Sequence, residues 1–183
     1  MASHKPVRSP ACDRHVNRLR DPSCRFKSRH AAGQAAASLR QGGYEGEIVI
    51  IGDEPHIPYQ RPPLSKAYLS GDVELDRVHL RPEKFYQDKN ITLKLNVAAS
   101  AIDAAAKTVS TDAGETISYE KLLIATGGRP RKLGIPGSDL AGIHYLRTIA
   151  DVDGIRNEMA ADSRMVIVGG GYIGLEVASV CLL

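Results

Sequence analysis

The sequence lacks the residue patterns that build dithiol, zinc and disulfide centres. Its three cysteines, Cys12, Cys24 and Cys181, have no C-x-x-C or other paired spacing. The six histidines show no ligand spacing, and no Ser/His/Asp arrangement is present. We therefore expect no metal site and no catalytic nucleophile, and scattered cysteines fit a reducing, cytoplasmic environment.

The chain also lacks an excess of positive charge outside its first thirty residues. Residues 1–30 hold eight Lys and Arg against two acids and account for the net charge of +3, so the remainder is mildly acidic. We interpret residues 1–30 as a non-native or disordered basic leader. A transit peptide or a nucleic-acid-binding arm are the alternatives. The leader has no amphipathic period and no signal-like apolar stretch, so we expect no nucleic-acid partner.

Only residues 165–183 form an apolar run about long enough to cross a bilayer. Glu176 lies in the middle of this run, where a carboxylate costs roughly 2.5 to 3.5 kcal/mol to insert. Four glycines crowd one end of it. We therefore expect no membrane anchor.

The remaining pattern predicts an α/β protein. Helix formers at 31–39 end at Gly42-Gly43, and a β-branched strand at 47–51 ends at Gly52-Asp53. A proline-rich loop at 56–63 precedes a short helix at 64–69. Further on, the sequence predicts helices at 83–89 and 149–159, strands at 91–95, 121–127 and 165–168, and an antiparallel meander of 99–102, 107–111 and 116–119 with its turn at 112–115.

The strongest single motif is Gly-Gly-Gly-Tyr-Ile-Gly at 169–174, which matches G-x-G-x-x-G between an apolar strand and a helix. Gly169 permits the tight turn, Gly171 lets backbone amides approach a pyrophosphate, and Gly174 allows close packing of helix on strand. The following helix turns its positive end toward the phosphates. This context predicts dinucleotide binding.

A degraded copy lies upstream. Ala31 stands where the first glycine is expected, Gly33 occupies the second position, and Asp53 follows Gly33 by twenty residues at the end of a strand, which is the spacing of a ribose-binding acid. Residues 23–30 are too basic to form the buried central strand that should precede this turn.

Six ordered blocks in residues 32–179 resemble the FAD-dependent ferredoxin reductases, a group that includes putidaredoxin and rubredoxin reductases within the pyridine nucleotide-disulfide oxidoreductase superfamily. The blocks are Ala-Gly-Gln-Ala-Ala-Ala-Ser-Leu-Arg, Ile-Gly-Asp-Glu, Tyr-Gln-Arg-Pro-Pro-Leu-Ser-Lys-Ala-Tyr-Leu, Ala-Thr-Gly-Gly-Arg-Pro-Arg, Tyr-Leu-Arg-Thr and Gly-Gly-Gly-Tyr-Ile-Gly-Leu-Glu. The resemblance implies a Rossmann-like FAD-binding domain with an antiparallel meander, followed by the start of a second Rossmann-like NAD(P)-binding domain. It also implies transfer of hydride from NAD(P)H to FAD and of electrons to a ferredoxin-like iron–sulfur protein.

The resemblance implies roles for individual residues. Lys66 approaches the reactive edge of the flavin, where a fixed positive charge favours the reduced state, and Glu176 pairs with it near the nicotinamide. The other implied cofactor-binding residues are Gly33, Ala35, Asp53, Glu54, Arg61, Ala99, Thr126, Gly127, Arg147, Gly169, Gly171 and Gly174.

Residue chemistry alone permits plainer interpretations of these positions. Asp53 can be a turn residue at a strand end. Lys66 and Arg61 can be solvated charges. Glu176 can be an acid near a helix N-terminus, stabilised by the helix dipole.

We predict three regions: the leader at 1–30, a partial FAD-binding domain at 31–147 and the beginning of a truncated NAD(P)-binding domain at 148–183. Such a reductase needs more chain than 183 residues supply, so a frameshifted or truncated gene product is expected. Two hypotheses follow: a reductase, or a catalytically silent fragment with at most weak nucleotide binding. The choice between NAD and NADP stays open, and flavoproteins like monodehydroascorbate reductase or apoptosis-inducing factor are alternative relatives.

Overall fold

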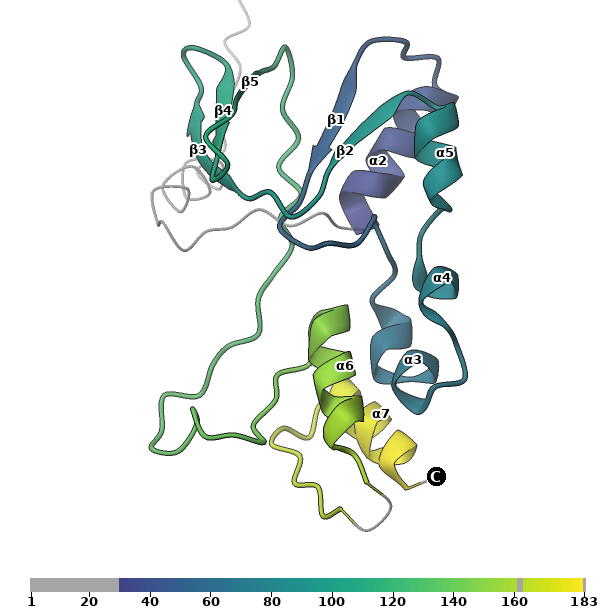
Figure 1. Ribbon diagram of the computed structural model, residues 1–183, viewed down its shortest axis with the longest axis vertical. Helices are drawn as coiled ribbons and strands as arrows, with labels where there is room; N and C mark the ends of the chain where they lie inside the picture. Colours follow the sequence, from purple (N-terminus) through teal and green to yellow (C-terminus); the bar gives the residue numbers. More distant parts are fainter. Residues whose placement is uncertain (1–29, 161–162, 183) are drawn as a thin grey trace, which may run out of the picture.

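The computed structural model describes residues 30–160 and 163–182, so the leader prediction lies outside the described residues except for His30. The first layered unit is a two-stranded parallel sheet, β1 (Ile48–Ile51) and β2 (Ile91–Lys94), in which Ile48 is opposite Ile91. Helices α2 (His30–Gln41) and α5 (Glu83–Asp88) pack on these strands (Figure 1). Strands rich in β-branched residues and covered by helices are expected of a parallel sheet. These predictions are confirmed.

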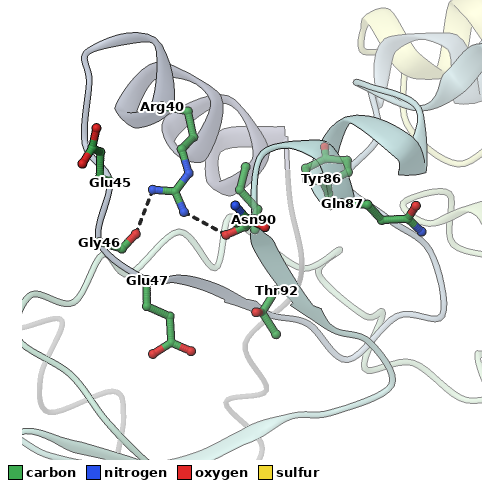
Figure 2. A pocket seen from close by; sticks show the side chains of 9 residues that line it. Arg40, Glu45, Gly46, Glu47, Tyr86, Gln87, Asn90 and Thr92 are labelled. Carbon is green, nitrogen blue, oxygen red and sulfur yellow. Dashed lines mark hydrogen bonds between the residues drawn. The ribbon is translucent and has the colours of Figure 1, made fainter.

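The end of α2 follows from its glycines and from Arg40. Gly43 adopts a positive φ of 83°, which a side chain would disfavour, and Tyr44 N donates to Leu39 O at 3.0 Å. The guanidinium of Arg40 donates to four carbonyls, those of Tyr44, Gly46, Lys89 and Asn90, at 2.6 to 2.8 Å. Figure 2 shows the bonds to Gly46 and Asn90. Arg40 thereby ties the end of α2 to the starts of β1 and β2.

The proline-rich loop leads into helical turns that are shorter than predicted. The helix expected at 64–69 is split into a 3-10 helix, η1 (Pro62–Ser65), and α3 (Ala67–Ser70). The break lies at Lys66, whose φ of −128° and ψ of −116° are not helical. A further turn, α4 (Leu75–Val78), carried no strong periodic signal and was not predicted.

The meander is confirmed. Strands β3 (Ala99–Asp103), β4 (Thr108–Thr111) and β5 (Thr116–Ser118) form an antiparallel sheet in that order. The turn between β4 and β5 contains Gly114, whose φ of 81° suits a glycine.

Two strand predictions are wrong. Residues 121–127 and 165–168 have no strand conformation, and Leu123 and Val166 expose 65% and 86% of their surface. An apolar run becomes a buried strand only where neighbours supply hydrogen bonds and cover both faces. In the described ranges 30–160 and 163–182, strands pair only within β1–β2 and β3–β4–β5, so neither run has such neighbours.

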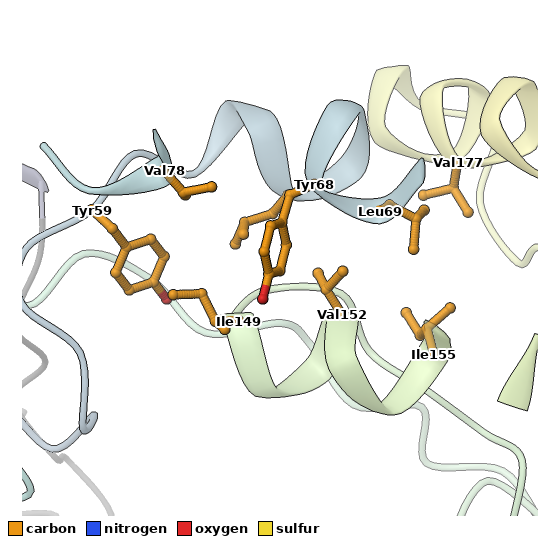
Figure 3. Packing of buried hydrophobic residues seen from close by; sticks show 9 residues of the cluster. Tyr59, Tyr68, Leu69, Val78, Ile149, Val152, Ile155 and Val177 are labelled. Carbon is orange, nitrogen blue, oxygen red and sulfur yellow. The ribbon is translucent and has the colours of Figure 1, made fainter. Parts of the chain in front are cut away.

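The last two helices pack on the proline-rich segment. Helix α6 (Ile149–Glu158) begins at a capping box of Thr148 and Asp151, and α7 (Tyr172–Cys181) follows the glycine turn. Both contact α3 and η1. Figure 3 shows the resulting core, which consists of Tyr59, Leu64, Tyr68, Leu69, Val78, Ile149, Val152, Ile155 and Val177. Side chains from both sides of the predicted boundary at 147/148 therefore share one core, and the boundary itself stays a prediction.

Helix α7 occupies ten residues of the apolar run at 165–183. Among the helices of the described residues, none is long and apolar enough to cross a membrane.

Candidate functional site

The first cluster joins the two predicted domains through an ion pair. Lys66 Nζ lies 2.6 Å from Glu176 Oε1, and Ser65 Oγ donates to Glu176 Oε2 at 2.5 Å. The hydrogen bond from Lys66, and secondarily that from Ser65, holds the pKa of the Glu176 carboxyl below its usual value. Glu176 is therefore ionised at neutral pH and Lys66 faces a fixed negative partner.

An open groove of about 510 Å³ lies beside this pair, between α3 and α7. Tyr172 and Leu175 of α7 line it with largely exposed side chains. Its other lining residues are Lys66, Ala67, Ser70, Asp72, Glu176, Ser179 and Val180. The groove thus combines an apolar wall with one cation and two carboxylates, which suits a polar molecule with a flat apolar part.

The second cluster is built on a buried carboxylate. Glu54 is only 7% exposed; its Oε2 accepts from the Tyr59 hydroxyl at 2.5 Å and its Oε1 from Arg61 at 3.0 Å. Burial, and secondarily this hydrogen bond, raises the pKa of the Tyr59 phenol well above its ordinary value. The Arg61 guanidinium also lies over the Tyr59 ring, 5.1 Å from the centroid, and donates to the carbonyl of Arg147. Both Glu54 oxygens accept from protein donors, so Glu54 positions Tyr59 and Arg61, and its contact with the ribose stays a prediction.

Arg147 brings a second guanidinium close to this cluster. Burial, and secondarily the charge of Arg61, lowers its pKa. Arg147 Nε is buried, and none of the described residues offers it a hydrogen-bond partner. The backbone N–H of Arg147 donates to Asp151 Oδ2 at 2.9 Å, which anchors the residue at the start of α6. A buried guanidinium donor without a partner in the described part of the chain, close to a second guanidinium and to only one carboxylate, would be satisfied by an anion such as a phosphate.

The glycine motif forms the turn before α7. Gly169 has a φ of 123°, and a Cβ on Gly174 would collide with the Gly169 carbonyl oxygen. Gly171 is the N-cap residue of α7 and provides no side-chain cap. Gly169 and Gly174 are therefore required by the backbone geometry, as the motif predicts. Both Gly169 and Gly171 are exposed.

The upstream copy has a different local explanation. A Cβ on Gly33 would lie 2.6 Å from Pro58 Cβ, so this glycine lets α2 approach the proline-rich loop. Ala35 is half-buried on α2, and Asp53 is half-buried just after the carboxyl end of β1. In open α/β sheets ligands bind at this edge. FAD contacts for the three residues stay predictions.

The remaining predicted residues lie on the meander and the segment after it. Ala99 begins β3 and is 5% exposed. Thr126 is half-buried and Gly127 takes a φ of 58°, both in the segment predicted as a strand. The roles of these three residues stay predictions.

A second hollow, of about 390 Å³, is lined by Arg40, Glu45, Glu47 and Tyr86 among others (Figure 2). It lies at the amino ends of β1 and β2, the edge where α/β sheets rarely bind ligands. Residues 30–160 and 163–182 contain no group of three or more His, Cys, Asp or Glu that could hold a metal ion.

Two residues of these clusters were not singled out from the sequence. Ser65 and Tyr59 both lie in the block Tyr-Gln-Arg-Pro-Pro-Leu-Ser-Lys. A hydroxyl carries no charge and no spacing signature, so only its contact with a carboxylate reveals it. Their position inside the most distinctive block was the one available signal.

Residues 28–182 match the family model described as pyridine nucleotide-disulphide oxidoreductase. The chain belongs to this family. Its likeness to solved structures supports the predicted α/β, Rossmann-like class. A ferredoxin reductase from Rhodopseudomonas palustris superimposes with a TM-score of 0.81 at 41% identity, covering 85% of this chain and 38% of that one.

Curated relatives are named as ferredoxin and rubredoxin reductases, the group that the sequence resembles. The probable ferredoxin reductase CtmF of Castellaniella defragrans is 45% identical over 82% of this chain and 37% of its own length. The rubredoxin-NAD(+) reductase of Ectopseudomonas oleovorans is 46% identical over 81% of this chain and 39% of its own. The resemblance to ferredoxin reductases is confirmed, and the chain spans less than two fifths of the length of these relatives.

Proposed function

We propose that the chain carries part of the FAD and NAD(P)H site of a reductase that passes electrons to a ferredoxin-like iron–sulfur protein. The observation that carries this proposal is the Lys66–Glu176 pair, which joins the proline-rich segment to the helix after the G-x-G-x-x-G turn. A cation and a carboxylate held together beside an open groove suit a place where a flavin ring and a nicotinamide meet.

The Arg61–Arg147 cluster supports the FAD part of the proposal. FAD carries a diphosphate, and the buried Arg147 Nε lacks a partner among the described residues. Arg61 and Arg147 would hold this diphosphate, while Glu54 and Tyr59 keep Arg61 in place. Asp53, at the end of β1, would take the ribose. When bound, FAD supplies hydride and electron transfer, chemistry that protein side chains lack.

The NAD(P)H part rests on the turn at 169–174. Backbone N–H groups at the start of α7 would face the dinucleotide phosphates. The groove between α3 and α7 would take the nicotinamide end, where Lys66 supplies a positive charge and Glu176 holds Lys66 in position.

The partner part rests on the relatives' names. One relative is a putidaredoxin reductase, and another solved structure, at a TM-score of 0.78 and 38% identity, is its covalent complex with putidaredoxin. By analogy, we propose that an iron–sulfur protein accepts the electrons from the present chain. We also propose a cytoplasmic location, without a nucleic-acid partner and without membrane attachment.

A second candidate is a nucleotide-binding chain without electron transfer. It is favoured by the exposure of the runs at 121–127, which contains Thr126, and at 165–168, which directly precedes Gly169. Loops without packed strands beneath them hold a cofactor less rigidly, and loose positioning slows chemistry more than it weakens binding.

One experiment separates the two candidates. The 183-residue chain is incubated with FAD, freed of unbound flavin and mixed with NADH or NADPH without oxygen. Loss of the flavin absorbance, followed by reduction of an added ferredoxin, supports the reductase. Retained FAD that neither nicotinamide reduces supports the second candidate, and failure to retain FAD contradicts the reductase.

A further inference from the structure

Two neighbours in the sequence reach the same carboxylate. Ser65 Oγ donates to Glu176 Oε2 at 2.5 Å, while Lys66 Nζ lies 2.6 Å from Glu176 Oε1. The carboxylate is thus held at both oxygens by one dipeptide. We propose that Ser65 is a positioning residue, which fixes the orientation of the Glu176 carboxylate toward Lys66 and fastens α7 to η1.

The backbone explains how two adjacent side chains can share a partner. Neighbouring residues in a continuous helix do not face the same side. Here the helix is interrupted at Lys66, where η1 ends and α3 has not begun. The interruption that the sequence did not predict therefore places the hydroxyl of Ser65 and the ammonium of Lys66 on a common target.

Burial shows why Ser65, and not Lys66 alone, sets the position of the carboxylate. Ser65 is 4% exposed, whereas the Lys66 side chain is 51% exposed. An exposed lysine keeps many rotamers, and exposed ion pairs contribute little. A buried hydroxyl is held by its surroundings and needs a partner, because a buried donor without one is costly. The Ser65 hydroxyl therefore fixes the position of the Glu176 carboxylate, and the Lys66 ammonium is placed by its ion pair with that carboxylate.

The neighbourhood contains few other charges. The elements packed against α7 are η1, which has no ionisable side chain, and α3, whose Tyr68 donates to Asp153 at 2.8 Å. Asp72 and Tyr172 complete the ionisable groups of the groove besides Lys66 and Glu176. The Asp72 carboxylate accepts from Ser70 Oγ at 2.6 Å. Ser65 and Lys66 are thus the donors to Glu176 in the part of the chain described.

The consequence for electron transfer rests on the proposed function. If Lys66 lies at the flavin edge, the position of Glu176 determines how much of the lysine charge faces the flavin. Loss of the Ser65 hydroxyl would let the carboxylate turn and would change the reduction rate more than the KM for NADH.

The test needs no cofactor. Carboxyl carbons of glutamate are labelled in the 183-residue chain, the Glu176 signal is assigned with Glu176→Gln, and its titration is followed by NMR. Ser65→Ala should raise the Glu176 pKa, because a donor to the charged form is lost, and Ser65→Thr should restore the wild-type value. Ser70→Ala is the matched control, since this hydroxyl lines the same groove but bonds Asp72 and the Ala67 carbonyl.

An unchanged Glu176 pKa in Ser65→Ala overturns the proposal. If Ser65→Ala does not fold, Ser65→Cys replaces it as a weaker donor of similar size, and its Glu176 pKa must lie above that of wild type. Flavin reduction is measured separately on the same variants. If no variant, wild type included, is reduced by NADH, the proposed function fails, while the titration still decides the role of Ser65.

Discussion

The ammonium of Lys66 lies 2.6 Å from the carboxylate of Glu176, although 110 positions separate the two residues in the sequence. The contact links the break between η1 and α3, just after the proline-rich loop, to α7, the helix that follows the glycine turn. The same loop supplies Tyr59 and Arg61 to the second cluster. One segment of about eight residues therefore organises both halves of the candidate site.

The lowered pKa of Glu176 predicts how the attachment of α7 depends on pH. A group with a depressed folded-state pKa stabilises the fold above its unfolded pKa, and this contribution is lost as the pH falls through the folded value. Wild type should therefore be more stable than Glu176→Gln near neutral pH, and the difference should vanish in acid. Urea unfolding across this range measures it. The exposed Glu120→Gln is the control, and a gap between wild type and Glu176→Gln that persists in acid would contradict the prediction.

The buried bond between Tyr59 and Glu54 predicts a loss of stability in Tyr59→Phe. Removal of the hydroxyl leaves one oxygen of a buried carboxylate without its donor, which costs about 1 to 3 kcal/mol. Denaturant unfolding should show this difference at neutral pH. Tyr44→Phe, at a 43% exposed ring, should change the free energy of unfolding by less than about 0.5 kcal/mol. Equal stability of Tyr59→Phe and wild type would show that the hydrogen bond between Tyr59 and Glu54 does not stabilise the fold.

The Arg147 side chain predicts a test of anion binding. Arg147→Gln should weaken FAD binding about tenfold or more, because a charge-assisted bond to phosphate contributes about 1.5 to 3 kcal/mol. Quenching of flavin fluorescence measures the affinity. The matched control is Arg77→Gln, an exposed arginine on α4, which should bind FAD as wild type does. Equal weakening in the two variants would indicate general loss of positive charge and not a site.

Much of the fold was predictable from local patterns. The β-branched run of β1, the glycines after α2 and the alternation of the meander are short-range signals, and each formed the expected element. The wrong strands had equally good local patterns. What residues 121–127 and 165–168 lack is a neighbouring strand, and that is a property of the whole chain which a run of side chains does not encode.

The candidate site was predictable only through the resemblance. Nothing local relates Lys66 to Glu176, and on residue chemistry alone each would be a solvated helix residue. The contacts of Ser65 and Tyr59 depend on burial and on a helix break, neither of which a hydroxyl residue signals in sequence. The contacts of Glu54 with Tyr59 and Arg61 likewise required coordinates.

The proposed function depends most on Lys66, which we propose to act on the flavin although half of its side chain is exposed. Its most direct test is the rate at which NADH bleaches bound FAD, compared with FAD retention, in Lys66→Met and in Lys84→Met, a lysine whose side chain is 80% exposed. A cation beside the reacting edge acts mainly where negative charge develops, so Lys66→Met should slow reduction about tenfold or more while FAD binding changes little. Lys84→Met should match wild type. Reduction of Lys66→Met at the wild-type rate would contradict the account and leave Lys66 as a solvated charge without a role in flavin reduction.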